Sequence, residues 1–339
     1  MSDPKISVLM PVYNAEAFVE RSVQSILNQT WRDFEFLIID NASTDNSFAI
    51  LQRWAKNDSR IRLLQNERNL GLVASLNRGC HEAHGKYIAR MDADDASRPK
   101  RLELQIKYME KHPEVGICGG QTSRHIAGRQ YRGRYFFSSE ECDVTLLFHS
   151  CFAHPAVMMK RSLFSADGYR YDDEFRQVED YDLWARMLAD VRGANLPEVL
   201  LDYYSHENQE SGTNYQAVST RRNTIRERVV RGLVPDATAE ELQLHHRIGF
   251  PQDPFDSEEL MRAERWLLRL IKANQASRRY NETAMRSVFA QRWALVCGHA
   301  TQLGSFTIRK FVASKLLNRS VSVASALKLM VKCGVKKHP

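Results

Sequence analysis

The sequence is poor in cysteine and contains no long hydrophobic run. Its six cysteines are far apart and include no C-x-x-C pair, which argues against a zinc site and against a dense disulfide framework. No stretch approaches the roughly 18 apolar residues that span a bilayer, and the amino-terminal residues lack the pattern of a signal peptide. We therefore expect reduced thiols and a cytoplasmic protein.

Acidic residues are absent from the last part of the chain. Glu282 is the last of them, and residues 283–339 hold ten Lys or Arg. Because the net charge of the whole chain is +7, residues 1–282 carry −3. No aromatic-studded RNA motif or recognition-helix pattern accompanies the basic tail, so we expect no nucleic-acid partner.

The composition, 43% apolar and 26% charged, is typical of globular proteins. Over the first 120 residues, short β-rich runs alternate with amphipathic stretches, which indicates an α/β layer with a mainly parallel sheet. The predicted strands are residues 6–12, 35–40, 61–66, 86–92 and 115–120, and the predicted helices are residues 15–28, 44–56, 72–83 and 99–111.

The pattern changes after about residue 121 and becomes mostly helical past Asn214. We expect a first domain of residues 1–215 and a helical, basic second region of residues 216–339 with an acceptor, membrane or packing role. The elements predicted in between are strands at residues 131–137, 155–161 and 197–204 and a helix at residues 178–190.

Polar side chains follow three of the predicted strands. Tyr13 and Asn14 follow the first, Asp40 and Asn41 end the second, and the acidic run 92–95 ends the fourth. Ligands of an open α/β sheet bind beyond the carboxyl ends of its strands. These clusters therefore predict a site at one edge of the sheet.

Three aspartates stand within four positions, Asp92, Asp94 and Asp95. Their charges repel unless a cation or a set of hydrogen-bond donors compensates them. The D-x-D spacing places the first two on the same side of an extended chain, and carboxylates suit Mg²⁺ or Mn²⁺ together with substrate phosphates. Solvated loop acids have the same pattern, so the metal interpretation depends on the surrounding motifs.

Five ordered motifs supply that context. They are MPVYNAEAFVERSVQSILNQT (10–30), LIIDNASTDNS (37–47), NERNLGLVASLNRG (66–79), YIARMDADD (87–95) and EDYDLW (179–184). In this order and spacing they resemble the family 2 glycosyltransferases of bacterial polysaccharide and O-antigen synthesis, over about residues 5–210. The resemblance implies the GT-A fold, an α/β fold with a mixed, mainly parallel sheet.

The resemblance also implies a reaction. A family member of this kind moves one sugar, with inversion, from a nucleotide diphosphate donor, here a UDP-sugar, to a glycan or lipid-linked glycan acceptor, with Mn²⁺ or Mg²⁺ as cofactor. A carboxylate-held cation neutralises the leaving diphosphate. One carboxylate on the opposite side accepts the proton of the attacking hydroxyl.

Matching the motifs residue by residue gives each candidate a role. Asp180 would be the catalytic base, with Glu179 as its rival. The metal ligands would be Asp92 and Asp94, with Asp95 beside them and His206 as a further ligand. The nucleotide sugar would contact Pro11, Val12, Tyr13, Asp40, Asn41, Arg68, Asn69, Asp92 and Ala93.

Structural roles compete with several of these assignments. Tyr13 could cap the first strand as a core aromatic, and the Asp40-Asn41 pair could serve only as turn and cap residues. His154 is more often a structural group than a diphosphate or acceptor contact, while Tyr181 and Trp184 suit either a sugar platform or the core. Ser43 and Thr44 are expected to cap the second helix.

Other functions fit less well. A nucleotidyltransferase needs a Gly-rich phosphate loop after the first strand, and "PVYNAEAF" contains no glycine. An aspartate-nucleophile phosphatase places its motif on an early strand, whereas "DADDA" lies beyond residue 90. A non-catalytic nucleotide-sugar or glycan-binding member is disfavoured by the presence of both Asp94 and Asp180.

The basic tail leaves two interpretations open. Over residues 307–337, Ile308, Phe311, Val312, Leu316 and Val323 share one helical side, away from most of the basic residues. Such a helix either lies on the anionic inner face of the plasma membrane or packs on the catalytic domain.

Overall fold

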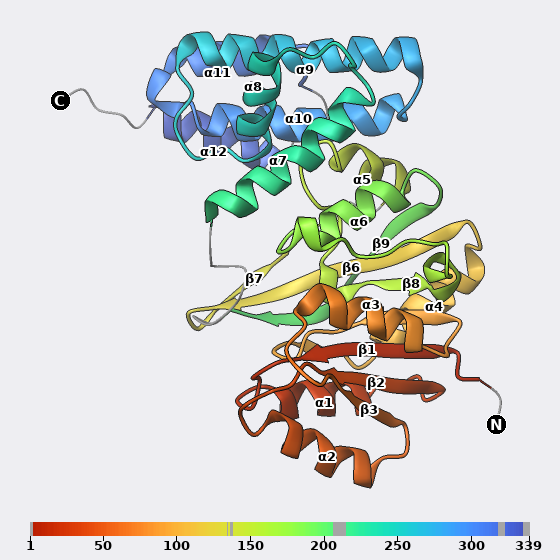
Figure 1. Cartoon of the computed structure of the whole chain (residues 1–339). Helices are drawn as coiled ribbons and strands as arrows, with labels where there is room; N and C mark the ends of the chain where they lie inside the picture. The colour runs from red at the N-terminus through yellow and green to blue at the C-terminus, as the bar shows by residue number, and fades with distance from the viewer. Residues whose placement is uncertain (1–2, 134, 136–137, 206–214, 318–322, 335–339) are drawn as a thin grey trace. The chain divides into compact units, whose positions relative to one another are not determined.

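The computed structural model describes residues 3–133, 135, 138–205, 215–317 and 323–334 (Figure 1). The chain forms two compact units, one of residues 1–139 and 150–221 and the other of residues 140–149 and 222–339. The predicted fold class is confirmed: a mixed, mainly parallel sheet precedes a helical region. The division into domains at residue 215 stays a prediction, and it did not anticipate that residues 140–149 group with the helical unit.

The first unit is built on one sheet with the order β3-β2-β1-β4-β8-β6-β9-β5, and β7 pairs with β6. β1, β2, β3 and β4 run parallel, as do β6 and β9, whereas β8 is antiparallel to both of its neighbours. The strands are β1 Ile6–Val12, β2 Phe34–Asp40, β3 Ile61–Gln65, β4 Tyr87–Arg90, β5 Ala96–Ser97, β6 Val115–Ile126, β7 Arg129–Arg132, β8 Met158–Lys160 and β9 Arg192–Tyr204.

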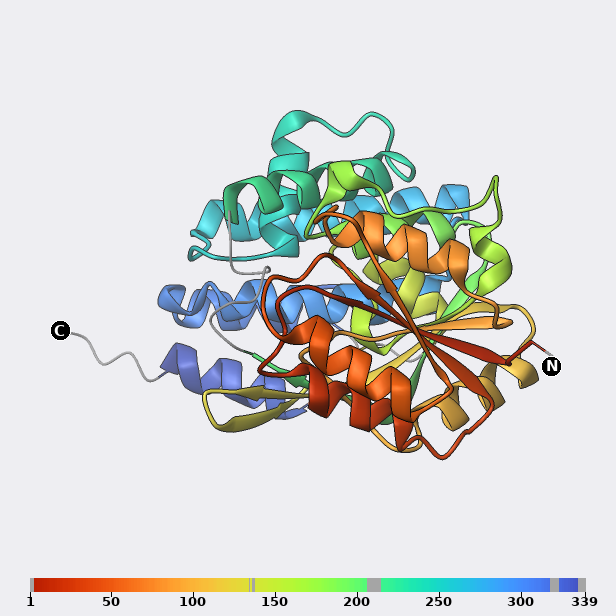
Figure 2. The ribbon, with the colours of Figure 1, turned by 60° about the horizontal axis from the view of Figure 1, so that its bottom comes forward.

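Helices cover both faces of this sheet, as Figure 2 shows for α1 and α2 on one face and α3 on the other. The α-helices are α1 Val19–Leu27, α2 Ser47–Asn57, α3 Leu72–Glu82, α4 Arg101–Lys111 and α6 Glu179–Met187, and the short 3₁₀ helices are η1 His154–Ala156, η2 Arg161–Phe164 and η3 Asp173–Phe175. The expected capping of α2 by Ser43 or Thr44 is wrong, because the helix begins only at Ser47.

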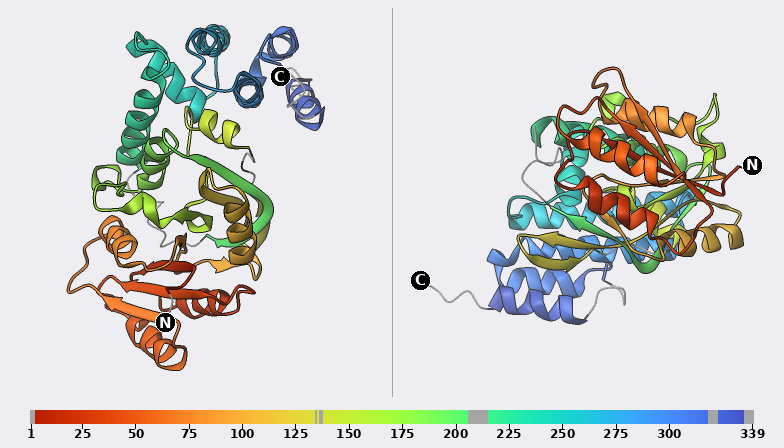
Figure 3. Two further views of the ribbon diagram at one scale, coloured as in Figure 1. Left: turned by 90° about the vertical axis from the view of Figure 1, so that its right-hand side faces the viewer. Right: turned by 90° about the horizontal axis from the view of Figure 1, so that it is seen from below.

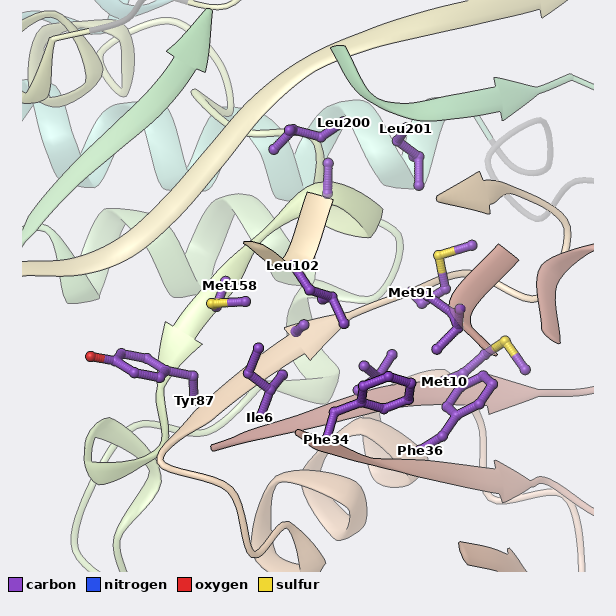
Figure 4. Close-up of a cluster of buried hydrophobic side chains, with 14 of the residues drawn as sticks. Ile6, Met10, Phe34, Phe36, Tyr87, Met91, Leu102, Met158, Leu200 and Leu201 are labelled. Carbon is purple, nitrogen blue, oxygen red and sulfur yellow. The ribbon is translucent and has the colours of Figure 1, made fainter. Parts of the chain in front are cut away.

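The main core lies between the sheet and α1, α2 and α4. Alternate residues of β1, β2 and β4 point into it because side chains alternate between the faces of a strand. Leu102 of α4 meets them there, with Leu200 and Leu201 of β9 (Figure 4). Ala89 and Met91 are core residues, and the side chains of Arg90 and Asp92, which alternate with them along the chain, point to the other side. At the end of β4 and just beyond it, Arg90 and Asp92 therefore point away from this core cluster.

The second unit is helical. It contains α5 Ser139–Thr145, most of α7 Tyr215–Arg231, α8 Ala239–Gly249, α9 Ser257–Ser277, α10 Glu282–Gly298, η5 Thr301–Leu303, α11 Ser305–Ala313 and α12 Val323–Gly334. Figure 3, left, shows some of these helices nearly end-on. Helices α8 and α9 each begin with a capping box, which satisfies their first N–H groups.

Residues 140–149 are held firmly within this second unit. The Phe148 ring stacks on His245 at 4.9 Å, and the Phe148 carbonyl accepts a 2.6 Å hydrogen bond from Arg226 Nε. In the same unit Phe311 and Leu316 of the basic tail are buried. Part of the apolar side predicted for the tail therefore packs within the protein. No helix in the described part of the chain is long and apolar enough to cross a membrane.

Candidate functional site

The three aspartates of the D-x-D run meet just beyond β4. One carboxylate oxygen each of Asp92, Asp94 and Asp95 lies within 4.8 Å of the other two. Asp95 is fully buried, whereas Asp92 and Asp94 are partly exposed. The three carboxylates are therefore clustered, with that of Asp95 buried and those of Asp92 and Asp94 partly exposed.

The backbone of this run is fastened by α1. Ser22 Oγ donates to the carbonyls of Ala93 and Asp95 at 2.7 and 2.6 Å, and Arg21 Nη2 donates to the Asp94 carbonyl at 2.5 Å. On the other side, the Tyr204 N–H donates to Asp95 Oδ1 at 3.0 Å. The run is thus held from two sides, so its carboxylates are preorganised rather than mobile.

The electrostatics of the triplet suit a divalent cation. Burial raises the pKa of Asp95 well above its ordinary value, and the negative charges of Asp92 and Asp94 raise it further. Asp95 Oδ2 is buried and has no hydrogen-bond partner among the residues that the structure describes. Burial and the same three carboxylates also raise the pKa of Tyr203 to about 12. A Mg²⁺ or Mn²⁺ ion, which prefers oxygen ligands, would compensate this negative charge and occupy the unpaired oxygen.

The triplet contacts a residue that we did not predict as part of the site. Arg90 is 3% exposed, and its Nη1 lies 2.5 Å from Asp92 Oδ2. Burial lowers the pKa of Arg90, but the charge and the hydrogen bonding of Asp92 outweigh that effect, so the pKa of Arg90 is raised. The sequence signal was an arginine inside an otherwise apolar strand, where an unpaired charge is too costly to bury.

Glu179 and Asp180 begin helix α6, after a strained entry. Gln177, two residues earlier, has a φ of 69°, which few non-glycine residues adopt. Ser150 Oγ donates to Asp180 Oδ2 at 3.1 Å, and Asp180 is partly exposed. Glu179 is 5% exposed, and burial, followed by the charge of Asp180, raises its pKa to about 7. Asp180 is therefore the more accessible of the two candidate bases.

Glu179 should make folding stability depend on pH. Its folded-state pKa is about 7, against an ordinary value of 4.5. Between these values the unfolded chain loses the proton while the folded chain keeps it, so the free energy of unfolding should fall as pH rises, by about 3 kcal/mol in all. Urea unfolding of the wild type and Glu179→Gln at pH 5 and pH 8 should show a larger loss in the wild type than in the variant. Parallel pH profiles would contradict the assignment.

The loops after β1 and β2 are joined by hydrogen bonds. The Asn14 N–H donates to Ser43 Oγ at 3.1 Å, and Asn14 Oδ1 accepts from the Thr44 N–H at 2.8 Å. This network presents Tyr13, which is 45% exposed, so the interpretation of Tyr13 as a core aromatic is wrong. An exposed ring at a strand end is available to stack on a base.

Asp40 and Asn41 have different surroundings. Asp40 Oδ2 accepts from the Ser43 N–H and from Gln65 Nε2, while its buried Oδ1 has no hydrogen-bond partner in the described part of the chain. The Asn41 amide is already engaged, because its Oδ1 accepts from Asn66 Nδ2 and the Leu70 N–H. Asp40 is therefore better placed than Asn41 to accept a hydrogen bond from a base.

The remaining nucleoside-side candidates lie near β3. Asn41 Nδ2 donates to Asn69 Oδ1 at 2.7 Å, so Asn69 belongs to the same network. Arg68 lines an open pocket, whose other walls are Gln65, Asn66, Glu67, Leu70 and Arg78. The expected contacts from Pro11 and Val12 are less favoured, because both residues are buried and Val12 packs in the core.

Several open alternatives are resolved by burial. Tyr181 and Trp184 are buried at 2% and 0% exposure, so they are core residues and not a sugar platform. His154 lies 2.9 Å from the Tyr171 hydroxyl, and burial, together with the Arg90 cation, lowers its pKa well below the ordinary value. His154 is therefore a neutral structural group. His206 lies outside the described residues.

Comparison with known proteins relates the chain to one family. Residues 7–167 match the model of glycosyl transferase family 2. The chain is 34% identical over 206 residues to the O-antigen biosynthesis glycosyltransferase WbnJ of Escherichia coli, a match that covers 59% of this chain and 80% of WbnJ. It is 32% identical over 195 residues to the Escherichia coli UDP-Glc:alpha-D-GlcNAc-diphosphoundecaprenol beta-1,3-glucosyltransferase WfgD, with 56% of this chain and 72% of WfgD covered.

A solved structure extends the similarity to the fold. Residues 1–349 of S. aureus TarS in complex with UDP-GlcNAc superpose with a TM-score of 0.59, covering 96% of this chain and 90% of that one. The sequence identity is 14%, so this similarity concerns the fold alone.

Proposed function

We propose that this chain, a glycosyltransferase that belongs to glycosyl transferase family 2, transfers one sugar from a UDP-sugar to a hydroxyl group of a glycan or lipid-linked glycan. The transfer inverts the anomeric carbon, depends on Mn²⁺ or Mg²⁺ and serves cell-surface polysaccharide synthesis. The observation that carries this proposal is the cluster of Asp92, Asp94 and Asp95, in which one carboxylate oxygen of each residue lies within 4.8 Å of the other two. This cluster offers oxygen ligands for the cation that a leaving diphosphate needs, and the partly exposed Asp180 in the first turn of α6 is the candidate base.

Both the residues of this chain and the names of its relatives support a UDP-sugar as the donor. Asp40 Oδ1, which is buried and has no partner within the described ranges, would suit the N3–H of uracil, and the exposed Tyr13 ring would suit its face. WfgD uses UDP-glucose by name, and the TarS structure contains UDP-GlcNAc. Asn41, engaged with the loop that contains Asn69, would shape this base site without reading it.

The proposed chemistry assigns a task to each carboxylate. Asp92, Asp94 and Asp95 would hold the divalent cation, which, when bound, neutralises the leaving UDP. Asp180 accepts the proton of the acceptor hydroxyl as that hydroxyl attacks the anomeric carbon. Its position in the first turn of α6 favours the ionised form, because the helix dipole is positive there. One base without a second carboxylate nucleophile fits a single inverting displacement, by analogy with glycosidases.

A nucleotide-sugar panel tests this function. We expect thermal unfolding to shift upward with UDP and with one UDP-sugar in the presence of Mn²⁺, and the shift to disappear with EDTA, because a ligand stabilises only the state that binds it. UDP release from that donor should also require the metal. A metal-independent shift, or preference for GDP or dTDP, would reject the corresponding part of the proposal.

A lipid-linked acceptor would bring the enzyme to the inner face of the plasma membrane. WfgD, by name, acts on a diphosphoundecaprenol-linked sugar. The tail of this chain lacks acidic residues, and the exposed side chains of α11 and α12 include Arg309, Val312 and Val331. Since Phe311 is buried, we propose peripheral contact through exposed cations and these few apolar side chains, without insertion of a whole amphipathic face.

Charge reversal in the tail should weaken vesicle binding. Lys315, Lys328 and Lys332 are exposed, and each basic residue near an anionic surface contributes about 1 kcal/mol. We therefore expect the K315E/K328E/K332E variant to bind phosphatidylglycerol-containing vesicles at least about 100-fold more weakly than the wild type in sedimentation.

The matched control places the same charge change in the other unit. Lys56, Lys100 and Lys111 are exposed there, and K56E/K100E/K111E should retain binding. Equal weakening of both variants would indicate a net-charge effect, and a wild type that stays in the supernatant would reject membrane contact.

A further inference from the structure

The side chain of Arg21 joins the loop of the triplet to an aromatic ring. Its Nη2 donates a 2.5 Å hydrogen bond to the Asp94 carbonyl, and its guanidinium carbon lies 3.7 Å from the centre of the Tyr204 ring. A guanidinium is attracted to an aromatic face, and because it is planar the contact also restricts its orientation. The Tyr204 ring therefore favours the orientation in which Arg21 donates to the loop.

The Tyr204 ring is in turn held by the neighbouring strand. His125 of β6 is its register partner across β9, and the two rings stack with their centres 4.6 Å apart and an angle of 15° between their planes. A ring nitrogen of His125 lies 2.9 Å from Asp202 Oδ1, which also accepts a 2.7 Å hydrogen bond from Arg98 Nη2. The sheet and its side-chain contacts thus fix the ring independently of the loop that it supports.

Tyr204 acts on the triplet in two separable ways. Its backbone N–H donates to Asp95 Oδ1 at 3.0 Å, a contact that any residue except proline could make. Its ring acts instead on Asp94, through Arg21. Replacing the ring therefore removes one support of the triplet and leaves the other in place.

The charge of Arg21 and its hydrogen bond have opposite effects on a bound cation. Like charges repel, so an arginine beside a metal site weakens metal binding through its charge. A contact that preorganises the ligands strengthens metal binding. Replacing Arg21 by an uncharged residue therefore raises the metal affinity if the charge dominates, and lowers it if the support of the loop dominates.

We propose that Tyr204 and Arg21 are positioning residues of the cation site. The ring orients the arginine, and the arginine fixes the backbone of Asp94 so that its carboxylate stays with those of Asp92 and Asp95. This inference rests on the proposed function, since it needs the divalent cation that the triplet is proposed to hold. Replacing groups that orient metal ligands changes metal affinity by about 10- to 100-fold.

Calorimetric titration of Mn²⁺ into the full chain, alone and saturated with UDP, tests the pair without a transfer reaction. In each condition in which the wild type binds Mn²⁺, Tyr204→Leu and Arg21→Gln should weaken binding about tenfold or more. Tyr204→Phe keeps the ring, so its dissociation constant should stay within about twofold of the wild-type value. The double variant with Leu and Gln should lose little more than either single variant, because both changes remove the same support.

Arg60 provides the matched control. Its guanidinium carbon lies 4.7 Å from the centre of the Phe34 ring, and its Nη2 donates to the Leu27 carbonyl at 3.3 Å, so it makes the same two kinds of contact. Phe34 begins β2, whereas the triplet follows the end of β4, and these strands are both parallel to β1. Arg60→Gln therefore acts at the opposite end of the sheet and should leave the Mn²⁺ affinity unchanged.

The outcomes separate the two proposals. Unchanged or tighter Mn²⁺ binding by Arg21→Gln, or equal losses in Tyr204→Phe and Tyr204→Leu, overturns the positioning pair while the proposed function stands. Equal weakening in the Arg60 variant also overturns the pair, because it indicates a general effect on the fold. A wild type that binds Mn²⁺ in neither condition overturns the metal dependence of the proposed function and, with it, the pair.

Discussion

Asp180→Asn should abolish transfer while the donor still binds. The amide keeps the size of the side chain and can still accept from Ser150 Oγ, which lies 3.1 Å from Asp180 Oδ2, but it cannot take the proton of the acceptor hydroxyl. General-base catalysis contributes about 10²- to 10⁴-fold, so kcat should fall by that factor. The dissociation constant of the UDP-sugar should stay within about twofold. Steady-state transfer assays and calorimetry measure the two quantities.

An exposed aspartate of the same unit provides the control for this variant. Asp33 precedes β2, and Asp33→Asn should leave both kcat and donor affinity unchanged. Full activity of Asp180→Asn would move the base role to Glu179, the rival candidate. Loss of donor binding together with kcat would instead indicate that Asp180 contacts the donor.

Asp94→Asn should act at the other end of the reaction. Asp94 is one of three carboxylates within 4.8 Å, and its backbone is held by Arg21, so the amide should not disturb the loop. Removing one anionic ligand weakens the cation that neutralises the departing UDP. We expect kcat/KM to fall about 10³-fold at limiting Mn²⁺.

Metal titration distinguishes this effect from damage to the fold. High Mn²⁺ should recover part of the activity of Asp94→Asn but none of that of Asp180→Asn. At limiting Mn²⁺, donor binding by the Asp94 variant should also lose its EDTA sensitivity, because little metal is then bound. A variant with unaltered metal dependence would mean that Asp94 is not a ligand.

The amino-terminal half of the fold was predictable because its signals are local. The strand at residues 6–12 has the predicted bounds, and the helix predicted at residues 72–83 ends one residue early. These segments bury one face of short periodic elements, which sequence spacing reveals. The same reasoning missed β5, a two-residue strand that exists only because Ala96 and Ser97 pair with distant residues of β9.

In the candidate site, too, some features were predictable from the sequence and others were not. The strand-end acids were visible from their spacing, whereas the engagement of Asn41 depends on the loop that contains Asn66 and Leu70. Arg90 was overlooked because its side chain is buried beside the triplet, and the pattern of apolar and polar residues in its strand did not indicate this burial. The sequence shows which residues follow a strand, but only the structure shows which hydrogen-bond partners each of them has.

Residues 140–149 have a practical consequence for dissecting the protein. A fragment that ends at residue 221 would keep Leu147 and Phe148 but delete His245 and Arg226, which contact them. The fragment would present an uncovered apolar segment and should aggregate. Any chimera that exchanges the helical region with that of a relative must therefore also exchange residues 140–149. The two segments, although distant in the gene, must come from the same protein.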